Sequence, residues 1–98
     1  MQNIKLSYLY RDAGNYKQFG DIIFANPETL PLYEIEKQIK EKLIDGEFFS
    51  AKEWNLPTLY AYPKDRELDH TWHEFESVDY SEEKPIMKIS IQTFLNNL

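Results

Sequence analysis

The chain has 98 residues, a mass of 11.8 kDa and a net charge of −6, with 42% hydrophobic and 29% charged residues. This length and composition predict one folded domain, 1–98, because a chain this short rarely builds two cores and its usage is that of globular proteins. The absence of cysteine excludes disulfides and thiolate metal sites, and the acidic balance argues against a protein that coats nucleic acid.

Residues 1–25 predict an antiparallel hairpin. Residues 4–11 alternate with period two and place Ile4, Leu6, Tyr8 and Tyr10 on one side. Residues 12–15 include three residues that favour tight turns, and residues 16–25 are rich in the aromatic and β-branched residues of strands. Gly20 indicates a bulge in the second strand. Among the aromatic residues, we expect Tyr8, Tyr10 and Phe19 to belong to the core.

The next segment predicts one long amphipathic helix. Thr29 is a candidate N-cap, Pro31 suits the first turn, and Gly46 is the candidate residue just past the C-terminus. Between them, apolar residues recur at spacings of three and four, as one buried helix face requires. They are Leu32, Ile35, Ile39 and Leu43.

The second half predicts short strands and a final helical turn. Strands are expected at residues 47–52, 59–62 and 72–80. Residues 87–89 allow a further short strand, and Ser90 is expected to cap a short terminal helix. Neither face of segment 72–80 is wholly apolar, so we expect it at the edge of the sheet.

These elements predict an α+β fold in the order β-β-α-β-β-β, followed by the short helix. We expect a two-layer sandwich in which one long helix covers one face of an antiparallel sheet. A chain of this size buries about 60–65% of its unfolded surface, so the other face stays open.

Negative charge is concentrated in residues 65–83. This window holds eight acidic side chains against Arg66 alone, whereas residues 1–44 hold six acidic and six basic side chains. Such a density of carboxylates attracts basic surfaces and repels phosphate. A solvated acidic loop without a partner is the alternative interpretation.

The same window contains both histidines, which leaves a second hypothesis open. Asp69, His70 and His73, with the neighbouring carboxylates, could form a metal-dependent module or a small hydrolase-like enzyme. A strand would direct His70 and His73 to opposite faces, and no zinc helix motif, nucleophile elbow or phosphate-binding glycine loop is present. We therefore assign no catalytic residue, no metal and no cofactor.

A protein-binding surface fits the composition best. Tyrosine and tryptophan dominate interface energetics, and an acidic rim speeds the encounter with a basic partner. Closely spaced carboxylates can also imitate a phosphate track, so the expected partner is a nucleic-acid-handling protein. The chain itself is expected to be a monomer or a homodimer. The predicted partner-binding residues are Trp54, Tyr60, Tyr62, Asp65, Glu67, Asp69, Trp72, Glu74, Glu76 and Asp79.

Three strings carry a resemblance to a known family: YLYRDAGNYKQFG (8–20), IDGEFF (44–49) and LDHTWHEFES (68–77). They resemble those of a family of small uncharacterised bacterial proteins that has no established activity. The resemblance implies a compact domain in a bacterial or mobile-element protein of the cytoplasm. Small acidic proteins of this kind often act as inhibitors, antitoxins, immunity proteins or anti-defence factors, and by analogy we expect a non-enzymatic regulator.

No segment of the sequence predicts a membrane location. No apolar run approaches the roughly 20 residues that cross a bilayer. The stretch MQNIKLSYLYRD lacks the apolar core of a signal peptide. The expected location is therefore the cytoplasm.

Overall fold

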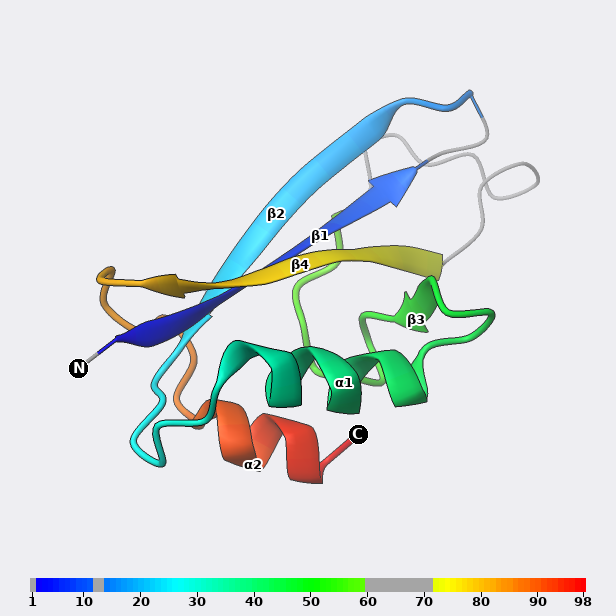
Figure 1. Ribbon diagram of the computed structural model, residues 1–98. Coiled ribbons are helices and arrows are strands. Elements are labelled where there is room, and N and C mark those ends of the chain that lie inside the picture. The colour runs from blue at the N-terminus through cyan, green and yellow to red at the C-terminus, as the bar shows by residue number, and fades with distance from the viewer. Residues whose placement is uncertain (1, 12–13, 60–71) are drawn as a thin grey trace.

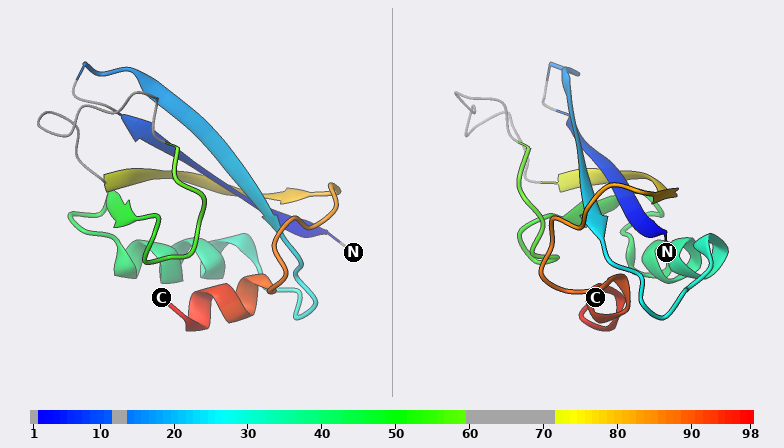
Figure 2. Two further views of the ribbon diagram at one scale, coloured as in Figure 1. Left: turned by 180° about the vertical axis from the view of Figure 1, so that it is seen from behind. Right: turned by 90° about the vertical axis from the view of Figure 1, so that its left-hand side faces the viewer.

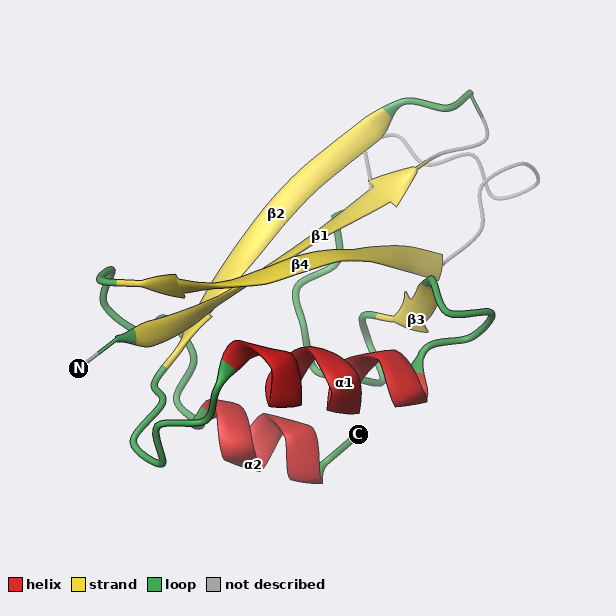
Figure 3. Ribbon diagram, viewed as in Figure 1, coloured by secondary structure: helices red, strands yellow, loops and turns green. Residues whose placement is uncertain are grey.

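The computed structural model describes residues 2–11, 14–59 and 72–98. It is an α+β domain with a curled antiparallel sheet of four strands in the order β2-β1-β4-β3 and two helices (Figures 1 and 3). The elements in chain order are β1 (Asn3–Arg11), β2 (Lys17–Phe24), α1 (Leu32–Lys42), β3 (Phe48–Ser50), β4 (Trp72–Ser81) and α2 (Ile91–Asn96).

The predicted hairpin is confirmed, with a different position for the bulge. β1 and β2 pair without interruption from Ile4 and Phe24 to Arg11 and Lys17, so Gly20 causes no irregularity there. The register shift lies between β1 and β4, where Glu76 is an extra residue on the β4 side. Gly20 instead packs closely against Leu59: a Cβ there would lie 2.8 Å from a terminal methyl group of Leu59, so that side chain would have to shift.

The core lies against one face of the sheet, which we call the inner face. The four alternating residues of β1 that the sequence predicts as buried are each at most 1% exposed. Both helices contribute to the same apolar cluster, so the structure does not confirm that one long helix alone covers the sheet. Both helices lie on the same side of the sheet (Figure 2). The helical members of the cluster are Ile35 and Ile39 of α1 and Ile91, Phe94 and Leu95 of α2.

Both predicted caps of α1 are wrong. The helix begins after Pro31, whereas Thr29 lies in the preceding turn with a φ of 56°. The buried side chain of Asn26 organises this turn by accepting from the N–H of Leu30 and donating to its carbonyl, both at 3.0 Å. No described side chain caps the N-terminus of α1.

The helix ends before it reaches Gly46. Leu43 is extended, and Gly46 follows Asp45 in a tight turn in which both residues have positive φ, 71° and 54°. The Glu47 N–H donates to the carbonyl of Ile44 at 3.1 Å and closes this turn. Two consecutive left-handed residues suit a hairpin turn, and an Asp-Gly pair favours it.

The remaining elements correct the predicted strands. The strand expected at 47–52 is shortened to β3, and residues 87–89 are irregular, with one parallel bridge between Ala25 and Ser90 nearby. In the segment expected at 59–62, Leu59 is irregular and residues 60–62 lie outside the described residues. Ser90 caps α2 as predicted, since its side chain accepts from the N–H of Thr93.

β4 is not the edge strand that its charges predicted. It lies between β1 and β3, because β3 pairs with the first three residues of β4. From Glu76 onward, no described strand pairs with the side of β4 that faces away from β1. No helix in the described part of the chain is long and apolar enough to cross a membrane.

Candidate interaction surface

The face of the sheet opposite the core, which we call the outer face, carries the candidate site. Side chains of a strand alternate between faces, so the residues of β1 between the buried ones lie on the outer face. The pairing register places residues of β2 and β4 beside them. The outer face contains Lys5, Ser7, Leu9 and Arg11 of β1, Lys17, Phe19, Asp21 and the buried Ile23 of β2, and Glu74, Ser77 and Asp79 of β4.

One end of the outer face is aromatic. Leu9 lies between Phe19 and Glu74 in the register and is only 8% exposed, whereas Phe19 is 63% exposed. The prediction that Phe19 is a core residue is therefore wrong. Trp72, at the start of β4, is 41% exposed and pairs with Ser50 of β3. Large aromatic groups thus remain accessible at this end.

An ion pair crosses this aromatic end. The Nε of Arg11 donates to Glu74 at 3.1 Å, and its Nη2 lies 3.4 Å from the other carboxylate oxygen. Arg11 also donates to the side chain of Asn15 at 3.0 Å, which ties the turn after β1 to the sheet. Glu74, a predicted partner-binding residue, is therefore already neutralised within the fold.

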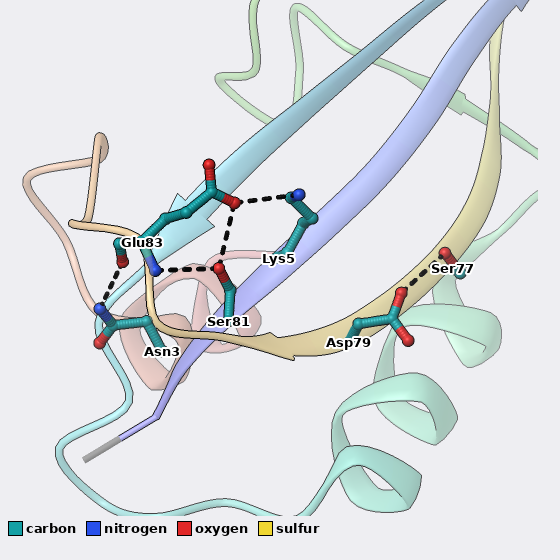
Figure 4. Close-up of polar contacts among 6 residues, drawn as sticks. All are labelled: Asn3, Lys5, Ser77, Asp79, Ser81 and Glu83. Carbon is teal, nitrogen blue, oxygen red and sulfur yellow. Dashed lines mark hydrogen bonds and ion pairs between the residues drawn. The ribbon is translucent and has the colours of Figure 1, made fainter.

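The other end of the outer face is polar and centres on Glu83 (Figure 4). The Nζ of Lys5 lies 3.0 Å from the Glu83 carboxylate, and the hydroxyl of Ser81 donates to the same oxygen at 3.1 Å. The Glu83 N–H donates in turn to Ser81, and the amide of Asn3 donates to the Glu83 carbonyl at 2.8 Å. These bonds order the chain immediately after β4.

The ion pair between Lys5 and Glu83 raises the pKa of Lys5 and lowers that of Glu83. The hydrogen bond with Glu83, and then its negative charge, raise the pKa of Lys5, and Asp21 and Asp79 nearby add to that effect. The hydrogen bonds from Lys5 and then Ser81 lower the pKa of Glu83. Lys5 is therefore one cation that faces three carboxylates.

Negative charge on β4 and the residues just after it exceeds what the fold neutralises. Segment 72–83 contains five acidic residues, of which Glu74 and Glu83 pair with Arg11 and Lys5. Glu76, Asp79 and Glu82 are exposed and have no ion-pair partner within the described ranges; Asp79 accepts a 3.4 Å hydrogen bond from Ser77. The predicted acidic residues Glu76 and Asp79 are thus available to a partner.

His73 has a structural role on the inner face. It is fully buried, and its ring lies 5.2 Å from that of Tyr10 and 6.0 Å from those of Tyr8 and Phe49. Its Nε2 accepts the N–H of Leu59 at 3.0 Å. A nitrogen that accepts a hydrogen bond carries no proton, so this contact requires the neutral imidazole.

The segment 56–59, which we call the strap, crosses the inner face. Besides the bond to His73, the hydroxyl of Tyr8 donates to the carbonyl of Pro57 at 2.7 Å, and Leu59 contacts Gly20. Burial, with a smaller contribution from Asp21, raises the pKa of Tyr8 to about 12. The strap thus joins β1, β2 and β4. In the sequence, the signal that His73 points toward the inner face was its alternation with Phe75 on β4.

The metal hypothesis finds no support among the described residues, which contain no group of three potential ligands. His70 and Asp69 lie outside the described residues. The predicted partner-binding residues Tyr60, Tyr62, Asp65 and Glu67 also lie outside them.

Trp54 packs on the core side of the sheet. Its ring stacks on Phe49 with the centroids 4.4 Å apart and meets Phe94 edge-on at 6.0 Å. It is partly buried against the main core cluster. The structure therefore does not bring Trp54 together with Trp72 and the acidic residues of β4 on the outer face.

An open pocket of about 460 Å³ lies beside the segment that precedes α2. Its lining contains one titratable side chain, Lys88, and is otherwise amide and apolar. The lining residues are Asn55, Ile86, Met87, Lys88, Ile89 and Asn97. Such a lining offers no pair of groups for acid–base chemistry.

Comparison with known proteins identifies no relative of this chain. No protein-family model matches the chain, and neither a curated protein nor a solved structure is significantly similar to it. The resemblance of its three strings to a family of small bacterial proteins stays an expectation. The function must therefore be inferred from the surface itself.

Proposed function

We propose that the protein is a non-enzymatic binding domain that regulates or inhibits a partner with a basic surface, such as a nucleic-acid-handling protein in the bacterial cytoplasm. Its framework is a two-layer α+β sandwich whose outer face is open. The binding surface consists of the outer face of β4 with the exposed aromatic residues beside it. The acidic residues Asp65, Glu67 and Asp69 extend it in the sequence.

The observation that carries this proposal is the charge left over after folding. Glu76, Asp79 and Glu82 are exposed on and after β4 without ion-pair partners in the described part of the chain. Carboxylates that a fold does not neutralise repel each other, and a basic partner removes that repulsion on binding. Trp72, 41% exposed at the start of the same strand, supplies aromatic area.

A titration with oligolysine tests the charge requirement. The wild-type protein should bind oligolysine with an affinity that falls as salt rises, and it should not bind duplex DNA. The double variant Glu76→Lys with Asp79→Lys should lose roughly tenfold or more in affinity. The control is Glu41→Lys with Glu53→Lys, which changes the net charge equally at exposed residues of α1 and the loop after β3.

The control decides the outcome. An equal loss in both double variants would mean that oligolysine responds to total charge, and the proposed surface would be wrong. The biological partner is tested in the same way, by crosslinked capture from a bacterial lysate. A genuine partner is lost with the β4 variant, retained with the control and displaced by added DNA.

A further inference from the structure

β2 forms one of the two edges of the sheet. β2 pairs with β1 on one side and is the last strand of the sheet on the other. The Ile23 carbonyl accepts the N–H groups of Ile86 and Met87, and the Ala25 carbonyl accepts that of Ile91, so odd-numbered residues direct their backbone groups outward. By the same alternation, Lys17, Phe19 and Asp21 point theirs away from β1.

This part of the edge has no partner within the chain as described. No described hydrogen bond involves the outward N–H or C=O groups of Lys17, Phe19 or Asp21, and no described ion pair involves their side chains. The turn at Asn15, with a φ of 67°, limits the free edge at one end, and the segment at Ile86 limits it at the other. An unpaired edge of this kind is a template for another strand.

The sequence of the free edge is complementary to itself. In an antiparallel pair of two copies centred on Phe19, each Lys17 lies opposite Asp21 of the other copy, and the two Phe19 rings lie opposite each other. All three side chains are on the outer face, so the opposed pairs share one side of the joined sheet. Opposite charges and aromatic pairs directly across two strands are stabilising.

We propose that two copies of the chain associate through this edge into a symmetric dimer with a continuous eight-stranded sheet. Because Lys17, Phe19 and Asp21 all point their backbone groups outward, each opposed pair exchanges both of its N–H···O bonds across the two-fold axis. The exposed ring of Phe19 loses contact with water at the centre. Its charged neighbours then fix the register.

The association is expected to be weak. The free edge is short, and two chains of net charge −6 repel each other. Interfaces below roughly 1,000 Å² are typical of transient complexes, and a dissociation constant on the order of tens of micromolar corresponds to that class. This inference does not depend on the proposed function, since it uses no acidic residue of β4.

Sedimentation velocity over a range of protein concentrations tests the dimer by charge exchange. The wild-type protein should shift from monomer to dimer as its concentration rises. Lys17→Asp and Asp21→Lys should each be monomeric, because each places like charges opposite each other. An equimolar mixture of these two variants should dimerise again, since every Asp then lies opposite a Lys.

The matched controls are Lys37→Asp and Glu41→Lys, which make the same charge changes at exposed residues of α1 and should dimerise like the wild type. Circular dichroism confirms that each variant is folded. A wild-type protein that stays monomeric at millimolar concentration overturns the proposal. A mixture of the two β2 variants that does not recover the dimer overturns the proposed register.

Discussion

On β2, two phenylalanines five residues apart experience opposite environments. Phe24 is fully buried on the inner face and contacts the ring of Phe94 at 4.8 Å, whereas Phe19 is 63% exposed on the outer face. Residue type and local sequence hardly distinguish them. At Phe24 the inner face of this strand belongs to the core of the domain, whereas at Phe19 the outer face is exposed to solvent.

The largest expected effect comes from replacing phenylalanine with alanine on each of the two faces. Phe24→Ala should lower the free energy of unfolding by about 3–5 kcal/mol, because it leaves a cavity against α2. Phe19→Ala should change it by no more than about 0.5 kcal/mol. Urea unfolding followed by circular dichroism, at a concentration where the protein is monomeric, measures both. Similar losses in the two variants would contradict the division between the faces.

A smaller loss of stability is expected from removing the hydrogen bond between Leu59 and His73 on the inner face. His73→Phe should preserve the aromatic packing but leave the N–H of Leu59 without its acceptor, at a cost of about 1–3 kcal/mol. Hydrogen exchange at the Leu59 amide should accelerate in this variant more than exchange in β1. Unchanged protection at Leu59 would show that His73 does not hold the strap.

The smallest effect appears only at alkaline pH. The pKa of Tyr8 is raised from 10.0 to about 12, so between these values the folded state retains a proton that the unfolded state has lost. Stability is therefore fully present below pH 10 and falls as the pH rises toward 12. In Tyr8→Phe this part of the alkaline decline should disappear. Unfolding titrations at several pH values measure it, and an unaltered decline would assign it to other groups.

The local elements could be predicted because their signals are periodic. The alternation in residues 4–11 and the spacing of Ile35 and Ile39 each determine a buried face without knowledge of the neighbours. The cap at Ser90 is equally local, since its side chain reaches an N–H three residues ahead. The predicted caps at Thr29 and Gly46 were wrong. Thr29 lies in the turn that Asn26 organises, and Gly46 lies in the hairpin turn with Asp45.

The candidate surface could be predicted only in part. The acidic character of β4 and the exposure of Trp72 agree with the sequence argument, but the burial of Trp54 and the neutralisation of Glu74 depend on residues far away in the chain. The free edge at Lys17, Phe19 and Asp21 was missed. Its alternating pattern was visible, but a strand edge is defined by the absence of a neighbour, which no local pattern reports.

The sequence alone determined the α+β class, the principal helix, the first hairpin and the acidic character of the second half, because these depend on periodicity and composition within short windows. The tertiary structure decided the order of the strands, the inward orientation of His73 and which aromatic rings remain exposed. These depend on contacts between segments that are distant in the chain, and their energies exist only once the segments have met.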